Sequence, residues 1–480
     1  MQRVQPYQAY HLFTVEQTRT LEHTAMAHLA PHQLMQRAGL AVANLACALT
    51  PHARRVWIAC GPGNNGGDGL EAAVHLQQRG YQPLVTLLGN PETLPADAKA
   101  SWLRAVAAGV RITSQPPERP DLCIDALLGI GSTRPPSDQI AHWIATINTS
   151  NALVLAVDTP TGLQADTGIC AHSCVQADHT LSLLTLKPGL FTAHGRDAAG
   201  QVWWEDLGVR ESIEAPCARL GCSQDAQWIG YSHASHKGTR GDVVIVGGAA
   251  GMVGAAFLAA SAALHCGAGR VFVSLLDPCN MAFQPTQPEL MLRALCDLPD
   301  HPLTLVCGCG GGTPIRGALP ELLARPDGLV LDADALNAIA VDTALQQLLR
   351  QRSKQAPTVL TPHPLEAARL LGTDTSHIQN DRLAAAQALV EQFQCTVVLK
   401  GSGTITAAPQ QIPFINPTGN GRLATGGTGD VLAGMIGARL ASGLAAFDAA
   451  SIAVFQHGQT ADRWPPDSTL TAGTLASAVR

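Results

Sequence analysis

Short apolar runs alternate with stretches of helical periodicity along the first half of the chain. Residues 14–50 carry apolar positions at helical spacing and predict two helices, the first opened by a capping-box pattern at Thr14 and Gln17. Strands that alternate with helices indicate a parallel sheet with right-handed crossovers. The predicted strands of this half are residues 56–60, 84–88, 122–128, 153–157 and 180–186.

The alternation returns in the second half, after the periodicity lapses at residues 205–235. The Pro and Gly residues of that interval are typical of a linker. We therefore predict an α/β fold with two domains, residues 1–215 and residues 225–480. Ligands of parallel sheets bind beyond the carboxyl ends of the strands, so we expect sites in the loops there. The strands of this half are predicted at residues 242–246, 271–275 and 303–306 and in the runs that start at Leu329, Thr358 and Cys395.

Composition narrows the functional classes. The 480 residues are 46% hydrophobic and 14% charged, which describes a packed protein of several domains. A formal charge of −6 gives no electrostatic case for nucleic-acid binding. Thirteen cysteines without a C-x-x-C pair, and an N-terminus without the apolar core of a signal peptide, favour a cytoplasmic protein with free thiols. Cys170, His172 and Cys174 have unusual spacing for zinc, so we expect no metal there.

Residues 243–269 contain no Asp, Glu, Lys or Arg, as a membrane span would. However, Gly247, Gly251 and Gly254 divide this segment into a short strand, a loop and an alanine-rich helix. A spanning helix would be rich in large apolar residues along its whole length. We therefore predict no membrane segment.

A small-residue turn at residues 424–430, ending in Asp430, precedes an apolar stretch with helical spacing. Backbone N–H groups in a glycine turn at a helix N-terminus suit an anion. A carboxylate beside such a turn would repel a phosphate unless it had its own role, such as accepting a proton from a substrate hydroxyl. The alternative is that Asp430 only caps the helix.

Lys400 ends an apolar strand and is followed by the small-residue loop of residues 401–404. The loop would supply N–H donors to a phosphate and the lysine would supply charge. The chain has no GK[ST] sequence, so this is not a Walker A loop. A solvated lysine is the alternative. Lys400 with its loop, and the turn at Asp430, together form the layout of small-molecule kinases with the ribokinase-like fold.

In the first half, residues 61–66 match GxGxxG after a strand, which would indicate a dinucleotide-binding unit. Asp68, however, stands where a pyrophosphate needs donors, and Asn64 and Asn65 bring side-chain amides into the loop. These residues favour a ligand with hydroxyls and amides, or a cation.

Several motifs of this half, in order, resemble the NAD(P)H-hydrate epimerase domain: residues 34–39, the NNGGDG loop at 64–69, residues 129–135 and residues 158–162. The resemblance implies a Rossmann-like three-layer fold that interconverts the two epimers of hydrated NAD(P)H. Asp158 would be the proton-transfer residue. The implied substrate-binding residues are Asp158 with Asn64, Asn65, Gly66, Gly67, Asp68, Gly129, Ile130, Gly131, Ser132, Thr133, Arg134 and Pro135.

The same resemblance implies a potassium ion held by Asn65, Asp125 and Thr161. The family usually has serine at the position of Thr161 and glutamate at that of Gln36. Threonine keeps an oxygen ligand, so the cation site is retained. Without the resemblance, the simpler interpretation of Asp125 and Asp158 is that they cap loops after strands.

Motifs of the second half resemble the ADP/ATP-dependent NAD(P)H-hydrate dehydratase: residues 236–241, 251–256, 332–337, 363–366 and 416–430. The resemblance implies that the substrate hydroxyl is phosphorylated, with Asp430 as the base, before phosphate leaves. Mg²⁺ is implied too, with Asp332 and Asp334 either assisting it or capping a helix. The implied substrate contacts are Ala255, Gly312, His363 and Asp430, and the implied nucleotide contacts are Lys400, Gly401, Ser402, Gly403, Thr404 and Gly429.

This half departs from the family pattern at residues 421–423 and at Cys307 and Cys309. Neither change removes a group with a proposed chemical role, so we expect effects on loop shape and rate. The fused order favours a bifunctional nicotinamide-nucleotide repair enzyme, with K⁺ and Mg²⁺, with ADP preferred to ATP, and acting as a homo-oligomer. One alternative is a sugar or vitamin kinase with a non-catalytic Rossmann-like domain. Another is that the first half is a binding or scaffold module.

Overall fold

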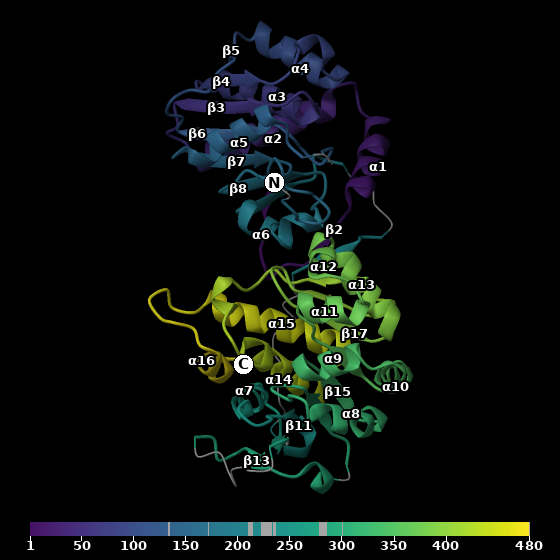
Figure 1. Cartoon of the computed structure of the whole chain (residues 1–480). Coiled ribbons are helices and arrows are strands. Elements are labelled where there is room, and N and C mark those ends of the chain that lie inside the picture. Colours follow the sequence, from purple (N-terminus) through teal and green to yellow (C-terminus); the bar gives the residue numbers. More distant parts are fainter. Residues whose placement is uncertain are drawn as a thin grey trace. The chain divides into compact units, whose positions relative to one another are not determined.

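The computed structural model describes residues 1–132, 135–170, 172–209, 215–221, 233, 237–277, 286–299 and 301–479. The chain divides into two compact units. The N-terminal unit comprises Met1–Gln5 and Tyr10–Arg219, and the C-terminal unit comprises Pro6–Ala9 and Leu220–Arg480. Each unit is an α/β domain in Figure 1, as the alternating pattern predicts.

The N-terminal unit is built on a sheet with the strand order β1-β9-β8-β7-β6-β3-β4-β5, in which only β1 runs antiparallel to its neighbour. The strands are β1 (Gln2–Arg3), β3 (Arg55–Cys60), β4 (Gln82–Leu87), β5 (Arg111–Thr113), β6 (Leu122–Ala126), β7 (Leu153–Val157), β8 (His179–Leu183) and β9 (Gln201–Glu205), besides β2 (Tyr10–Leu12). The helices are α1 (Val15–Met26), α2 (Gln33–Leu49), α3 (Asn64–Gln78), α4 (Ala96–Ala107), α5 (Asp138–Thr149) and α6 (Gly195–Ala198).

Three layers make up this unit. Helices α2, α3 and α4 pack side by side on one face of the sheet, where the largest apolar cluster of the unit lies. Helix α5 covers the other face, with Trp143 set edge-on against Trp57 of β3. The capping box predicted at Thr14 and Gln17 is present at the start of α1. The three-layer prediction is confirmed.

The C-terminal unit has a second sheet in which β13-β12-β11-β14-β15-β16-β17 are parallel and β18 and β19 extend it antiparallel. Its strands are β11 (Asp242–Gly247), β12 (Arg270–Leu275), β13 (Met291–Leu292), β14 (Thr304–Cys307), β15 (Gly328–Leu331), β16 (Thr358–Leu360), β17 (Thr396–Leu399), β18 (Ile405–Ala407) and β19 (Phe414–Ile415). Its helices are α7 (Val253–His265), α8 (Ile315–Ala324), α9 (Ala333–Ala340), α10 (Thr343–Ser353), α11 (Pro364–Leu371), α12 (Thr375–Asn380), α13 (Arg382–Phe393), α14 (Thr428–Ala441), α15 (Ala446–Asp462) and α16 (Ala472–Ala478).

The helices of this unit form two groups. Helices α7, α14, α15 and α16 contact one another, and α8 to α11 form the other group, with the parallel strands between them (Figure 1). Residues 243–269 have the predicted order of strand, loop and helix: the strand is β11, the helix is α7, and the loop lies between them. Within the described residues, no helix combines the length and the apolar content that crossing a membrane would require.

Short elements escaped the sequence analysis. β10 (Ala218–Leu220) lies inside the interval that we interpreted as a linker, and β5 and β1 were not predicted. Strands of two or three residues are too short to show a period of two, so they depend on their neighbours in the sheet.

Residues 6–9 belong to the C-terminal unit although they are near the start of the chain. The hydroxyl of Tyr7 accepts hydrogen bonds from Gln459 at 2.8 Å and from Arg463 at 3.0 Å, both near the end of α15. Its ring stands edge-on to Phe455, with 5.6 Å between the ring centroids. Tyr7 is thus held to α15 by polar and aromatic contacts.

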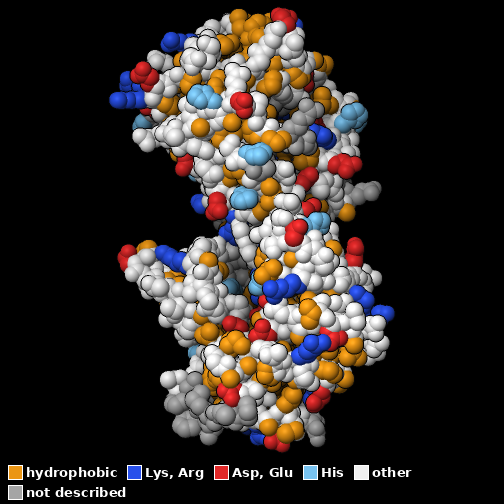
Figure 2. Space-filling view, viewed as in Figure 1, with side chains coloured by type: hydrophobic (Ala, Val, Ile, Leu, Met, Phe, Trp, Pro, Cys, Tyr) orange, Lys and Arg blue, Asp and Glu red, His pale blue; other side chains and the backbone are white. Residues whose placement is uncertain are grey.

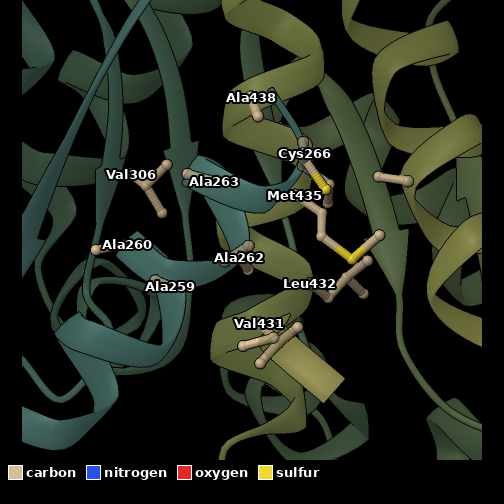
Figure 3. Packing of buried hydrophobic residues seen from close by; sticks show 14 of the residues in the cluster. Ala259, Ala260, Ala262, Ala263, Cys266, Val306, Val431, Leu432, Met435 and Ala438 are labelled. Carbon is tan, nitrogen blue, oxygen red and sulfur yellow. The ribbon is translucent and has the colours of Figure 1, made fainter. Parts of the chain in front are cut away.

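Helices α7 and α14 pack through small residues (Figure 3). Ala259, Ala262 and other alanines of α7 lie in one buried cluster with Val431, Leu432 and Met435 of α14. At Gly434 the two helices come so close that an added Cβ would lie 2.0 Å from the carbonyl oxygen of Ala259. This position therefore requires glycine for packing.

The first prediction concerns Gly434→Ala. Because its Cβ would collide with backbone, we expect the free energy of unfolding of the C-terminal unit to fall by about 2 kcal/mol or more. Gly317→Ala is the matched control, since Gly317 is also helical and a Cβ there meets nothing within 4 Å. That change should raise stability by up to about 1 kcal/mol. Urea unfolding of the full chain measures both, and equal effects would contradict the packing account.

Candidate functional site

A cavity of about 490 Å³ opens in the N-terminal unit, at the carboxyl ends of β3, β6 and β7. This is the edge of a parallel sheet where ligands bind. Arg19 and Glu22 of α1 contribute to its wall. Eight of the predicted substrate residues line it: Asn64, Asn65, Asp68, Gly129, Ile130, Gly131, Ser132 and Asp158.

Other residues predicted for this site do not line the cavity. Gly66 and Gly67 are in the first turn of α3, where an added Cβ would lie 2.0 Å from the carbonyl oxygen of Gly61 and 2.6 Å from the sulfur of Met35, respectively. They let α3 approach its neighbours closely. Pro135 is exposed and outside the wall. Thr133 and Arg134 lie outside the described residues.

Asp158 occupies an unusual backbone position directly after β7. Its φ of 66° is in the left-handed region, which a non-glycine residue adopts at a cost and which often marks a functional site. Its carboxylate accepts long backbone hydrogen bonds from Ile130 and Leu183, both at 3.4 Å. The side chain is thereby aimed at the cavity that it lines.

Lys187 is a cavity residue that the sequence analysis missed. Its side chain is fully buried, and its Nζ donates to Asp158 Oδ1 at 2.5 Å and to the carbonyl oxygen of Leu183 at 2.7 Å. The signal was available, because Lys187 follows an apolar strand as Lys400 does. Its pairing with Asp158 required the fold.

Acidic groups crowd the rest of the cavity. Burial, followed by the charges of Asp158 and Glu22, raises the pKa of Asp68 well above its ordinary range. Burial and the charge of Asp158 likewise raise the pKa of Glu22. A carboxyl that retains its proton can donate a hydrogen bond, which is the donor that Asp68 seemed to lack in the sequence.

The three residues predicted to bind potassium lie behind the cavity wall. Asp125 is fully buried at the end of β6, and its carboxylate accepts hydrogen bonds from Thr161 Oγ1 at 2.7 Å, from the N–H of Thr161 at 2.8 Å and from the N–H of Leu127 at 3.2 Å. Burial raises the pKa of Asp125 to about 6. The amide nitrogen of Asn65 is buried without a hydrogen-bond partner. These oxygen-rich side chains suit a hard cation.

In the C-terminal unit, Lys400 is paired and not merely solvated. Its Nζ donates to Asp332 Oδ1 at 2.6 Å and lies 4.0 Å from Glu366. Burial alone would lower the pKa of Lys400, but these two carboxylates outweigh it and the pKa is raised. A Cβ on Gly429 would lie 3.3 Å from this nitrogen. The fold thus joins the lysine loop to the turn that carries Asp430.

The loop after Lys400 is shaped by glycine and braced from behind. Gly401 and Gly403 both have positive φ, and Thr404 Oγ1 donates to the carbonyl oxygen of Gly401 at 3.0 Å. Arg382, almost fully buried, donates to the carbonyl oxygens of Leu399 and Lys400 at 3.2 Å. Arg382 is a bracing residue that the sequence analysis missed.

Asp430 is in the first turn of α14, but it does not occupy the N-cap position. That position is taken by Gly427, whose φ is 93°. Burial, followed by the charge of Asp332, raises the pKa of Asp430 to about 6, while Cys309 and Lys400 act in the opposite direction. A carboxylate with this pKa is ionised at neutral pH and can accept a proton.

Asp332 and Asp334 are both engaged by protein groups. Asp332 is at the N-cap of α9 without a side-chain cap bond, because its carboxylate faces Lys400. Asp334 accepts a hydrogen bond from the N–H of Gly312 at 2.8 Å. Both side chains thus have protein partners.

His363 opens α11 as its N-cap, with Pro364 in the first turn as predicted. Its Nδ1 accepts hydrogen bonds from the N–H groups of Leu365 and Glu366 at 3.1 and 3.3 Å. Burial and Lys400 lower the pKa of His363. The neutral ring must therefore carry its proton on Nε2, since Nδ1 is an acceptor.

Of the other predicted substrate residues, Ala255 is in the first turn of α7 and Gly312 is on the loop after β14. A Cβ on Gly310 would lie 2.9 Å from the Cβ of Ala255, and one on Gly312 would meet Ala249 and Met252.

Figure 2 shows acidic and basic side chains interspersed over the visible face of each unit. The zinc grouping that we rejected at Cys170 and Cys174 does not form a set of three close ligands in the described part of the chain.

Fold and side chains together define a class: a protein of two α/β units, each with a lysine–aspartate pair beside the carboxyl ends of its parallel strands. Comparison with known proteins identifies the family within this class. Residues 243–479 match the family described as NAD(P)H-hydrate dehydratase, and residues 31–189 match the family described as YjeF-related protein N-terminus.

Curated relatives match nearly the whole chain. The bifunctional NAD(P)H-hydrate repair enzyme Nnr of Escherichia coli (strain K12) is 37% identical over 450 residues, which cover 90% of this chain and 85% of that protein. The enzyme of the same name from Coxiella burnetii is 34% identical, covering 94% of each chain. The chain belongs to the family of bifunctional NAD(P)H-hydrate repair enzymes.

Among solved structures, the ADP/ATP-dependent NAD(P)H-hydrate dehydratase from Bacillus subtilis, co-crystallised with ATP and Mg²⁺, is similar to the second half. It is 30% identical and covers 53% of this chain and 92% of its own, with a TM-score of 0.46.

The second prediction concerns the buried pair of Lys187 and Asp158. Lys187→Met should lower the free energy of unfolding of the N-terminal unit by about 3 kcal/mol or more, because it leaves a buried carboxylate without its cation. Adding Asp158→Asn should restore about 1–3 kcal/mol relative to additivity. As a control, Lys99→Met breaks the exposed pair with Glu92 and should cost under about 1 kcal/mol. Urea unfolding of the unmodified chain, the two single variants and the double variant measures this cycle. Strict additivity of the two single effects would refute the pairing.

Proposed function

We propose that the C-terminal unit restores NAD(P)H from its hydrate by phosphorylating the hydroxyl and then releasing phosphate. The observation that carries this proposal is that Asp430, Gly429 and Lys400 meet at one place, although the chain separates them by about 30 residues. Asp430 takes the hydroxyl proton, and the Gly426–Gly429 turn offers N–H groups to the transferred phosphoryl group. Hydroxide leaves poorly, whereas phosphate leaves readily, so the ester then eliminates.

The nucleotide contacts assigned by this proposal are Lys400, Gly401, Ser402, Gly403, Thr404 and Gly429. Substrate contacts are Ala255, Gly312, His363 and Asp430. ADP is the expected phosphoryl donor, which would release AMP and phosphate, and ATP is the other candidate. Mg²⁺ would arrive on the nucleotide phosphates and neutralise their charge.

For the N-terminal unit we propose epimerisation of the R and S forms of the hydrate. Inverting the hydroxyl-bearing carbon means breaking and remaking a bond there, with a proton given and taken. Asp158, in the cavity wall and paired with Lys187, is placed to move that proton. The substrate would be held by Asn64, Asn65, Asp68 and the residues from Gly129 to Ser132. Family matching also assigns to substrate binding Gly66, Gly67, Thr133, Arg134 and Pro135.

Potassium is proposed for Asn65, Asp125 and Thr161. Support comes from the buried carboxylate of Asp125 and the hydroxyl of Thr161 beside it. A bound cation would favour the ionised form of Asp125 and tie the segment at Leu128, whose N–H donates to Thr161 Oγ1 at 2.9 Å, to the cavity wall.

These assignments place the epimerase within residues 1–215 and the dehydratase within residues 225–480. An epimerase on the same chain would let both forms of the damaged cofactor reach a dehydratase that accepts only the S form. The alternative, a sugar or vitamin kinase with a non-catalytic first domain, predicts a stable phosphorylated product and not free phosphate.

The third prediction tests the dehydratase. Hydrated NADH incubated with the full chain, Mg²⁺ and ADP should regain the absorbance of reduced nicotinamide and release one phosphate per NADH. Asp430→Asn should slow this by about 10²–10⁴-fold, because the general base is lost. In the unmodified chain, kcat should fall as the pH drops through about 6, since Asp430 is then protonated. Accumulation of a phosphorylated product, or a normal rate for Asp430→Asn, would overturn the assignment.

The fourth prediction separates the two units. Asp158→Asn keeps a side chain that tolerates the left-handed backbone but removes the base. With a mixture of epimers, NADH recovery should proceed through the S form and then continue only at the slow spontaneous rate of epimer exchange. With pure S form the rate should equal that of the unmodified chain. Recovery of both epimers at the normal rate would contradict the role of Asp158.

A further inference from the structure

Cys309 lies two residues beyond the end of β14, beside the proposed dehydratase base. Its carbonyl oxygen accepts a hydrogen bond from the N–H of Gly248 at 3.0 Å, and the carbonyl of the next residue, Gly310, accepts one from Ala249 at 2.7 Å. Its side chain is fully buried. The backbone therefore fixes this thiol in one place.

The thiol faces carboxylates. Cys309 Sγ and one carboxylate oxygen each of Asp332 and Asp430 all lie within 4.8 Å of one another. Burial, followed by the charges of Asp430 and Asp332, raises the pKa of the Cys309 thiol well above its ordinary range. The thiol thus remains protonated and acts as a donor.

The other groups around Asp430 have different partners. Lys400 is paired with Asp332 at 2.6 Å, and Glu366 lies beyond it at 4.0 Å. From α15, His457 is bonded to the carbonyl oxygen of Thr428 at 3.0 Å, and burial lowers its pKa to about 4, so it is neutral. Among these neighbours of Asp430, Cys309 is therefore the neutral side chain that is placed to donate a hydrogen bond to its carboxylate.

We propose that Cys309 is a positioning residue of the dehydratase site, whose S–H donates to Asp430 and holds this carboxylate ready to accept the substrate proton. A neutral donor orients a carboxylate without neutralising its charge, whereas a lysine would neutralise it. A single hydrogen bond also leaves further acceptor sites on the carboxylate for the substrate. Cys309 is a departure from the family pattern, and the fold places it beside Asp430. The inference rests on the proposed role of Asp430.

The test compares Cys309→Ala and Cys309→Ser with Cys307→Ala in the full chain, using S-form NADH hydrate, ADP and Mg²⁺. Cys307 is the matched control because it is equally buried and only two residues away, but is not in the group that Cys309 forms with Asp332 and Asp430. Cys309→Ala should lower kcat about tenfold with KM nearly unchanged. Its acid-side midpoint of kcat should move up by about one pH unit, because a hydrogen bond that favours the ionised Asp430 is lost.

Cys309→Ser keeps a donor, so its midpoint should stay near that of the unmodified chain, and Cys307→Ala should leave both kcat and midpoint in place. The proposal is overturned if Cys309→Ala retains the normal kcat and midpoint, or if serine shifts the midpoint as alanine does. Should the alanine variant not fold, the serine midpoint alone decides in the same way. A normal rate in Asp430→Asn would instead remove the proposed base, which distinguishes the two failures.

Discussion

Glycine contacts along α14 determine where the dehydratase site can form. Gly434 brings the helix against the backbone of Ala259 in α7, and a Cβ at Gly437 would lie 2.4 Å from Val306 of β14. The helix is thus pressed between a second helix and a strand. Its first turn, with Asp430, must then lie beside the loop that follows β14. The packing of small residues thereby fixes the distance between a base and the groups that tune it.

The two units solve a similar electrostatic problem. In each, a lysine that follows an apolar strand reaches an aspartate that follows another strand of the same sheet: Lys187 to Asp158, and Lys400 to Asp332. Parallel strands bring their carboxyl ends to one edge, so residues far apart in the chain can pair there. Around each pair stand further carboxyls whose pKa burial has raised, among them Asp68 and Asp430. The neighbouring lysines compensate these acids only partly, so the pKa of each stays above its ordinary range.

Much of this arrangement is predictable from sequence, and the reasons for the exceptions are physical. Apolar runs located most of the longer strands, although not β9, and helical periodicity located α1, α2, α3, α7 and α14, but not α4, α5, α10, α13 or α15. The motifs located loops at the strand ends. The pairing of Lys187 with Asp158 spans 29 residues, and that of Cys309 with Asp430 spans more than a hundred, so no local pattern encodes them. At Gly66 and Gly67 the motif predicts substrate contact, and only the fold shows that their missing Cβ atoms also allow the close packing of α3. The remaining assigned residues stay predictions.

The anchoring of Tyr7 on α15 has a consequence for biosynthesis. Tyr7 precedes its partner Gln459 by 452 residues, so a ribosome releases it long before α15 exists. The segment that contains Tyr7 must therefore wait for this partner until α15 has been made. Domains generally fold in order as they emerge. Here residues 6–9 belong to the C-terminal unit but are synthesised before the N-terminal unit. The C-terminal unit can therefore complete its fold only by binding a segment that was made much earlier.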